Sequence, residues 1–306
     1  MLEVELDIFS GMSNPKWILS EAEEKELLEI ITSDPTQISP VHTPEEKFGL
    51  GYRGLIVREI KSDDGIWNRT NRILESPLPW AFRVGSKPGK QAVAAEWLLQ
   101  TSEKKCSKVT GELREVVAEG VVLIPTSREV VDLTTSSEGN KVSRSVRWET
   151  CHSNLFYSNA STFNQPQNIS QNNCYAFASN HIGGGRWAHP GLHGGRPARE
   201  FNCSDVQGGL YADGWTHHGC WPNASKVLII ACFIFPGHDF HFYRLVSDGP
   251  RWLWAHKQGD GLARHTDNDG RTIENDITPL NCNRGRYTDF CGFFYQSNST
   301  AFVKSY

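Results

Sequence analysis

One cysteine in the C-terminal half of the chain has the local context of an enzymatic nucleophile. Cys174 follows the polar residues Asn172 and Asn173 and precedes an apolar run, which predicts that it lies in the first turn of a helix. There, unpaired backbone amides and the helix dipole would stabilise a thiolate. We therefore expect Cys174 to be a nucleophile, with Asn172 or a nearby backbone amide stabilising an oxyanion.

Two histidines further along the chain are predicted to assist this thiol. His241 lies in an aromatic run that follows Pro236-Gly237, a pattern typical of a half-buried strand. His256 ends the next predicted strand, beyond a turn at residues 247–250. Adjacent strands would bring the two imidazoles together, so we expect His241 to be the general base and His256 to orient it.

Both predictions have structural alternatives, which the sequence leaves open. The chain contains 8 cysteines, and exported proteins usually pair their cysteines. A disulfide at Cys174 would remove the nucleophile, and an apolar environment would leave it an inert buried thiol. His241 and His256 would equally suit a β-sheet core in which their ring nitrogens are hydrogen-bonded.

Aromatic side chains and a glycine-rich loop surround the proposed site in the sequence. Such residues could stack a planar or sugar-like ligand in a cleft, although aromatic residues are also typical of the core of a β-rich domain. The candidate substrate-binding residues are Trp187, His189, Trp215, Tyr243 and Trp254.

No metal or cofactor is expected. His189 and His193 would have ligand spacing only in a helix, which Pro190 and the neighbouring glycines exclude. The glycine-rich loop lacks the pattern that binds phosphates. The formal net charge of −4 is spread over mixed charges, and the apolar runs are strand-sized. We therefore expect a small-molecule or peptide substrate as the partner, and neither nucleic acid nor a membrane.

The elements that would position this site are predominantly strands. We expect strands at residues 227–235, 238–246, 252–256 and 291–295, and a helix that starts near Cys174. The C-terminal domain, residues 148–306, would pack this helix on an antiparallel sheet. The fold class is therefore α+β.

The N-terminal residues 1–132 form a separate strand-and-helix unit, and residues 133–147 are a polar linker. We expect an edge strand from Leu2 to Ile8, a helix at residues 21–31 that Ser20 and Glu23 cap, a strand at 51–58 and a helix at 91–101. No chemistry is expected in this unit.

The order of one cysteine on a helix and two histidines on adjacent strands resembles the papain-like fold in its compact bacterial form, the cell-wall amidopeptidases of the NlpC kind. Two groups of motifs also resemble mainly bacterial proteins without an assigned activity. The first is Phe-Ser-Gly-x-x-Asn-Pro-x-Trp at 9–17. The second comprises Asn-Asn-Cys-Tyr-Ala-Phe-Ala at 172–178, Ala-His-Pro-Gly at 188–191, Ala-Asp-Gly-Trp at 212–215, His-Phe-Tyr-Arg at 241–244, Ala-His-Lys at 255–257 and Phe-Cys-Gly-Phe-Phe at 290–294.

Features along the whole chain predict an exported protein whose signal peptide is absent from this sequence. Cysteines accompany Asn-x-Ser/Thr sequons, the acceptor sites for N-linked glycans. In size, sequons, cysteines and lack of a flavin, haem or nucleotide motif, the chain is similar to the secreted luciferases of syllid bristle worms. The sequons lie at Asn68, Asn159, Asn168, Asn202, Asn223 and Asn298.

Three functions follow from these observations. The first is thiol-dependent hydrolysis or acyl transfer on an amide or ester, with Cys174, His241 and His256 as the catalytic residues. The second, implied by the luciferase resemblance, is cofactor-free oxidation of a small luciferin by oxygen, with one of the histidines as base. The third is an exported module that binds a glycan or peptide in the aromatic cleft.

Overall fold

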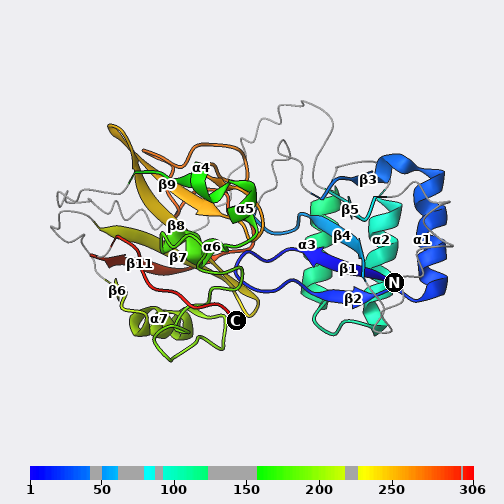
Figure 1. The fold of residues 1–306 in the computed structure, drawn as a ribbon, viewed down its shortest axis with the longest axis horizontal. Coiled ribbons are helices and arrows are strands. Elements are labelled where there is room, and N and C mark those ends of the chain that lie inside the picture. The colour runs from blue at the N-terminus through cyan, green and yellow to red at the C-terminus, as the bar shows by residue number, and fades with distance from the viewer. Residues whose placement is uncertain (42–49, 61–78, 87–91, 123–156, 218–226, 298) are drawn as a thin grey trace, which may run out of the picture.

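The structure is a computed structural model that describes residues 1–41, 50–60, 79–86, 92–122, 157–217, 227–297 and 299–306. The predicted linker at 133–147 lies outside the described residues, so the domain boundary remains a prediction. Figure 1 shows two units, one built from the residues before this gap and one from the residues after it.

The N-terminal unit contains an antiparallel sheet of five strands in the order β2-β1-β4-β5-β3. These are β1 (Leu2–Asp7), β2 (Lys16–Ile18), β3 (Ile38–Ser39), β4 (Gly54–Glu59) and β5 (Ala81–Val84). The prediction of an edge strand at Leu2–Ile8 is wrong, because β1 pairs with both β2 and β4. Its Asp7 carboxylate is buried and forms ion pairs with Arg53 and Arg83, which makes an acidic residue compatible with an inner strand.

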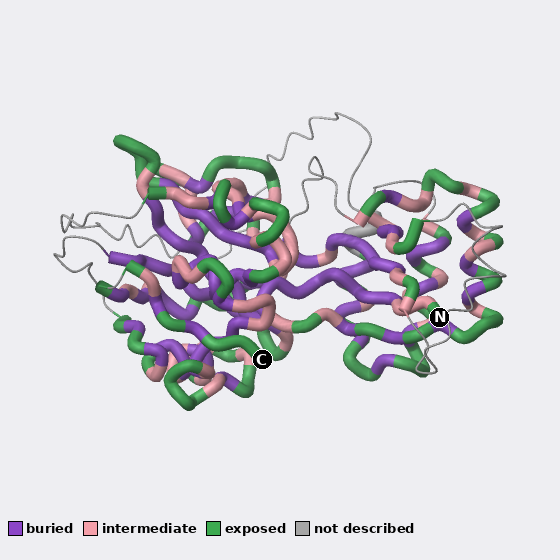
Figure 2. Tube along the Cα trace, in the orientation of Figure 1, coloured by how far each residue is buried: buried purple, intermediate pink, exposed green. Residues whose placement is uncertain are grey.

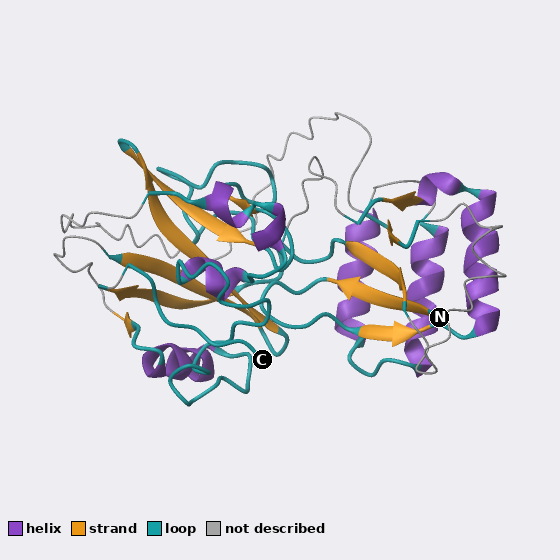
Figure 3. Cartoon of the chain, in the orientation of Figure 1, coloured by secondary structure: helices purple, strands orange, loops and turns teal. Residues whose placement is uncertain are grey.

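Three helices accompany this sheet: α1 (Glu21–Ser33), α2 (Val93–Thr101) and α3 (Gly111–Val122). The 3-10 turns Pro35–Gln37 and Ser102–Lys104 follow α1 and α2. The predicted capping box of α1 is confirmed, because the Ser20 side chain accepts from the Glu23 amide and the Glu23 carboxylate accepts from the Ser20 amide. Helix α2 packs against α1 and β4, and Figure 3 shows the three helices beside the sheet.

The C-terminal unit contains an antiparallel sheet of six strands in the order β10-β9-β8-β7-β11-β6. The four predicted strands are confirmed as β7, β8, β9 and β11, and the α+β fold class is confirmed with them. The strands are β6 (Thr216–His217), β7 (Leu228–Phe235), β8 (Asp239–Asp248), β9 (Arg251–Lys257), β10 (Ala263–Arg264) and β11 (Asp289–Gln296).

The helices of this unit are short: α4 (Ala160–Phe163), α5 (Pro166–Ile169), α6 (Cys174–Ala178) and α7 (Cys203–Ala212). Helix α6 packs on β8 and β9, which matches the prediction of a helix on an antiparallel sheet. Helix α7 packs on β11, to which the disulfide Cys203–Cys291 joins it. The papain-like relationship itself remains a prediction.

The loop between β1 and β2 reaches from the N-terminal unit into the C-terminal unit (Figure 1). The two units share one hydrophobic cluster, which includes Val4 and Leu6 of β1 together with Phe233 of β7 and Tyr287. Figure 2 shows that the strands on both sides of this contact are buried. The loop therefore enters the C-terminal unit through an apolar interface.

Within the described residues, no helix is long and apolar enough to cross a membrane. In the same part of the chain, no group of three or more His, Cys, Asp or Glu side chains is placed to hold a metal ion.

Candidate functional site: a buried histidine pair beside Cys174

Cys174 begins helix α6, as the sequence predicts. Asn173 is the N-cap, and its Oδ1 accepts from the amides of Tyr175 and Ala176, each at 3.1 Å. Cys174 is a free cysteine, so the disulfide alternative is excluded for this residue. Its side chain is fully buried, and burial together with the charge of Asp239 raises the pKa of the thiol. A helix of five residues has a small dipole, so the resting thiol is protonated, contrary to the expected thiolate.

His241 and His256 meet across strands β8 and β9, as predicted. Tyr243 pairs directly with His256 in the register of the two strands, so His241, two residues before Tyr243, is the diagonal neighbour of His256 on the same face. Nε2 of His241 lies 2.9 Å from Nδ1 of His256. The other ring nitrogen of His256, Nε2, lies 2.8 Å from the carbonyl oxygen of Thr266.

The geometry assigns the protons on both rings. A carbonyl oxygen can only accept, so Nε2 of His256 carries a proton and its Nδ1 accepts. His241 then donates through Nε2, which leaves the lone pair on its Nδ1 free to accept. Burial lowers the pKa of His256 to about 3, and burial together with His256 lowers the pKa of His241 well below its usual range. Both rings are therefore neutral at physiological pH.

The lone pair of His241 faces a residue from the N-terminal unit, Ser10, whose Oγ lies 2.9 Å from Nδ1. The same hydroxyl lies 3.1 Å from the carbonyl oxygen of Phe240 and 3.9 Å from Sγ of Cys174. Ser10 thus contacts both the thiol and the imidazole, which were predicted to interact directly. The N-terminal unit, in which no chemistry was expected, thus supplies a side chain that contacts the candidate site. In the sequence, the Phe-Ser-Gly motif at residues 9–11 could have indicated Ser10, but no local sequence pattern relates this motif to His241.

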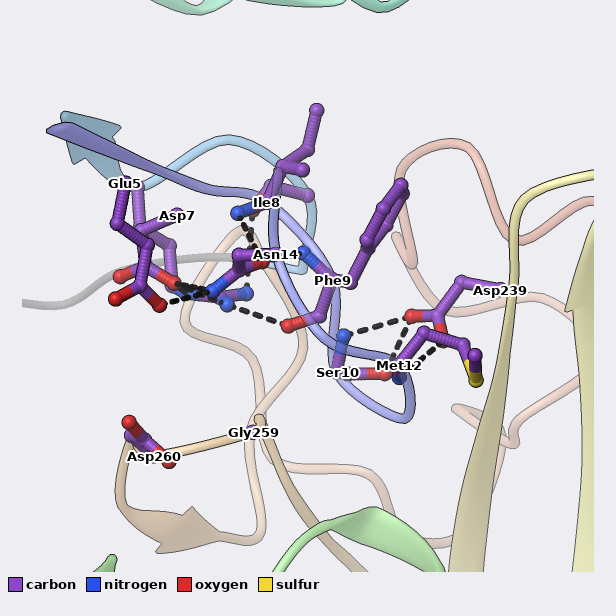
Figure 4. A network of polar contacts seen from close by, with 12 residues as sticks. Glu5, Asp7, Ile8, Phe9, Ser10, Met12, Asn14, Asp239, Gly259 and Asp260 are labelled. Atoms are coloured by element: carbon purple, nitrogen blue, oxygen red, sulfur yellow. Dashed lines mark hydrogen bonds and ion pairs between the residues drawn. The ribbon is translucent and has the colours of Figure 1, made fainter. Parts of the chain in front are cut away.

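Asp239 holds the Ser10 loop in place. Its carboxylate accepts from the backbone amides of Ser10 at 2.7 Å and Met12 at 2.8 Å, and from the Tyr287 hydroxyl at 2.6 Å. Figure 4 shows this carboxylate beside Ser10 and Met12. Burial raises the pKa of Asp239, and these hydrogen bonds partly oppose the effect. Asp239 was not among the predicted site residues, although it lies two residues before His241 on the same strand.

Lys257 is a second buried titratable group that the sequence analysis did not select. Its Nζ donates to the carbonyl oxygens of Ile169 and Gly259, both at 2.6 Å. Burial lowers its pKa to about 7. The positive charge of Lys257 lowers the pKa of Cys174, but this effect is smaller than the opposing effect of burial.

One of the predicted substrate-binding residues, Tyr243, contacts the histidine pair, whereas His189 packs on the other face of β8. The ring centroid of Tyr243 is 4.9 Å from that of His241 and 4.7 Å from that of His256. His189 packs edge-on against Phe240 at 5.5 Å, and its Nδ1 lies 3.1 Å from the carbonyl oxygen of Pro190. These two aromatic rings flank the strand that carries His241.

The other predicted site residues have structural contacts instead. Trp254 is buried against Phe293. Trp215 is also buried and donates to the Tyr175 hydroxyl at 3.1 Å. Trp187 is half-buried beneath the guanidinium of Arg186.

The Asn172 side chain donates to the Asn168 carbonyl and accepts from the Gly183 amide, both at 2.8 Å. Because both ends of its amide bind backbone groups, Asn172 holds two loops together.

Comparisons with known proteins give one informative match. No family model matches the chain, and no solved structure matches it. Insoluble matrix shell protein 1 of Ruditapes philippinarum is 39% identical over 139 residues, which cover 44% of this chain and 88% of that protein. The chain therefore belongs to the same family as insoluble matrix shell protein 1.

Proposed function

We propose that the chain is a cofactor-free enzyme in which His241 is a general base for an acidic small molecule, and that oxygen oxidises the resulting anion. The observation that carries this proposal is the oriented lone pair on Nδ1 of His241, which His256 and the Thr266 carbonyl fix in one tautomer. A neutral buried imidazole is already in the form that accepts a proton. The buried thiol is in the form that cannot attack.

In the proposed reaction, an acidic hydroxyl or C–H group of the substrate takes the place of the Ser10 hydroxyl. Its proton moves to Nδ1 of His241, and Nδ1 of His256 continues to accept from Nε2 of His241. The nearby carboxylate of Asp239 would stabilise the imidazolium. A carbon atom of the substrate anion then forms a bond to dioxygen, which is the co-reactant and oxidant. The resulting peroxide takes the proton back from Nδ1 of His241, so the product is a hydroperoxide and the base is regenerated. This reaction class is that of the secreted luciferases to which the chain is similar in overall form.

Thiol-dependent hydrolysis or acyl transfer is the second candidate. It is favoured by the free Cys174, which shares a contact with the Ser10 hydroxyl and therefore lies near His241. For this reaction, movement of Ser10 would have to bring the thiol and the imidazole together. The raised pKa of Cys174 makes this the weaker candidate.

Substitution of each reacting group separates the two reactions. We expect His241→Gln to lower oxygen-dependent turnover of small phenolic or luciferin-type compounds by about 100-fold or more, as is usual for loss of a general base. Cys174→Ala should retain that turnover within a few fold, and removal of oxygen should abolish it. Oxygen uptake and light emission are the measurements. The thiol enzyme would instead be established if the chain hydrolyses amides or esters and if iodoacetamide or Cys174→Ala abolishes this hydrolysis.

A role outside the cell is part of the proposal. It is supported by the Cys203–Cys291 disulfide, by the sequons and by the relative, whose name describes an insoluble protein of the shell matrix.

The name of this relative also favours a third candidate function, a non-catalytic module that binds a glycan or peptide. Sedimentation with insoluble polysaccharides would test it. The non-catalytic module would be favoured if the chain binds a polysaccharide, if His241→Gln leaves this binding unchanged, and if the chain turns over none of the tested compounds.

A further inference from the structure

We propose that the histidine pair belongs to a peptide-binding site that recognises a Ser-Gly segment, and that Ser10 and Gly11 occupy this site as an intramolecular ligand. The proposal concerns binding and does not depend on which reaction the chain catalyses. It rests on how the C-terminal unit contacts the loop between β1 and β2. The amides of Ser10, Gly11 and Met12, the Ser10 hydroxyl and the Gly11 carbonyl all meet partners in that unit.

The backbone of the loop is recognised by two side chains. The carboxylate of Asp239 accepts from three consecutive amides, those of Ser10 at 2.7 Å, Gly11 at 3.1 Å and Met12 at 2.8 Å. Nδ2 of Asn173 donates to the carbonyl oxygen of Gly11 at 3.1 Å. Asp239 and Asn173 are themselves buried. Among the described residues Asp239 forms no ion pair, and its carboxylate is stabilised by these peptide amides and by the Tyr287 hydroxyl.

Two further contacts select the side chains. The serine hydroxyl donates its proton to Nδ1 of His241 at 2.9 Å, so an alanine would leave this buried acceptor without a donor. A Cβ atom on Gly11 would lie 2.3 Å from Cε2 of Phe240, so only glycine fits after the serine. The site therefore reads the dipeptide Ser-Gly in addition to the backbone.

The N-terminal unit presents the loop in a fixed shape. Oδ1 of Asn14 accepts from the amides of Ile8 at 3.0 Å and Phe9 at 2.8 Å. Its Nδ2 donates to Glu5 at 2.9 Å, and Nη2 of Arg53 donates to the carbonyl oxygen of Phe9 at 2.6 Å. Figure 4 shows Asn14 between the acidic residues of β1 and the loop tip. A preorganised ligand on the same chain has an effective concentration of about 1 mM or more, so it excludes a free peptide of equal affinity.

This arrangement would also control access to the histidines. The Ser10 hydroxyl covers the lone pair of His241, and Ser10, His241 and His256 are all buried. A substrate reaches His241 only when the loop tip leaves. A partner that presents an exposed Ser-Gly peptide would compete with the loop for Asp239 and Asn173.

The test is a Gly11→Ala variant of the full chain, compared with Gly111→Ala, where an added methyl group meets nothing within 4 Å. The probe is a fluorescent synthetic peptide with the sequence of residues 8–14, IFSGMSN. We expect it to bind Gly11→Ala at least about tenfold more tightly than wild type or Gly111→Ala, because the steric clash with Phe240 expels the competing loop. A peptide in which alanine replaces the glycine should not bind.

Equal binding of the peptide to a folded Gly11→Ala variant and to the wild type would overturn the proposal. If Gly11→Ala does not fold, hydrogen exchange in the wild type decides. We expect the amides of Ser10, Gly11 and Met12 to exchange at least about 100-fold faster than those of β8, through local opening, and still faster when the peptide is added. The loop would be a permanent part of the core if these three amides exchange as slowly as the amides of β8 and if the peptide does not change their exchange rate.

Discussion

The Oγ atom of Ser10 lies 2.9 Å from Nδ1 of His241, although 231 positions separate the two residues in the chain. This hydrogen bond joins the two units at the histidine pair. It also satisfies the one imidazole nitrogen that the His241–His256 contact leaves without a partner. The N-terminal unit is therefore part of the candidate site.

Loss of this hydroxyl should destabilise the protein. Ser10→Ala leaves Nδ1 of His241 as a buried acceptor without a donor, which costs about 1 to 3 kcal/mol of the free energy of unfolding. Urea denaturation measures the change. Ser107→Ala is the matched control, because Ser107 is exposed and lies outside the sequons, and it should change the free energy by no more than about 0.5 kcal/mol. Equal effects of the two substitutions would show that the Ser10 hydrogen bond contributes nothing to stability.

The histidine pair should make the protein less stable in mild acid. The pKa of His256 is about 3 in the folded protein, against an ordinary value of 6.5, and that of His241 is also lowered. The unfolded chain therefore binds more protons than the folded one between these values, and stability is lost as the pH falls below about 6.5. Between pH 7 and pH 5 the loss from His256 is about 2 kcal/mol, and His241 adds to it in the same direction.

Denaturation by urea at the two pH values measures this loss, and His256→Asn tests its origin. This variant should show a smaller difference between pH 7 and pH 5 than the wild type, because the ring of His256 no longer titrates and no longer lowers the pKa of His241. An unchanged pH dependence in His256→Asn would assign the acid sensitivity to other groups.

Alkylation by iodoacetamide should show a protected Cys174. The side chain is fully buried and its thiol pKa is raised, so little thiolate is available at neutral pH. We expect the native protein to react at Cys174 at least about 100-fold more slowly than the protein unfolded in urea, as peptide mass mapping would measure. Rapid labelling of Cys174 in the native state would contradict this expectation and favour the thiol enzyme.

The buried ion pairs of β1 should matter more than those on the surface. Asp7→Asn removes the charge that pairs with the buried Arg53 and Arg83, which should cost about 3 to 5 kcal/mol. In the control, Asp248→Asn breaks an exposed pair with Arg251 and should cost less than about 1 kcal/mol. The difference between their thermal or urea midpoints is the measurement. Comparable losses in both variants would show that burial of the Asp7 pairs adds nothing.

Local patterns in the sequence determined much of the C-terminal sheet and part of its site. A continuous apolar run of strand length identifies β7, and aromatic-rich runs bounded by turn residues identify β8, β9 and β11. The turn at 247–250 makes β8 and β9 neighbours, so the contact between His241 and His256 follows from two consecutive strands. The helix start at Cys174 follows in the same way from the capping residue Asn173.

Only the tertiary structure decided the protonation of Cys174, His241 and His256, and only the tertiary structure brought Ser10 to them. The protonation of Cys174 and of both histidines depends on burial, which results from packing of the whole chain rather than from flanking residues. Glu5 and Asp7 resemble solvent-exposed residues in sequence, but arginines from other strands neutralise them and make β1 an inner strand. Ser10 reaches His241 only because a loop of one unit docks into the other, and local sequence patterns carry no information about such a long-range contact.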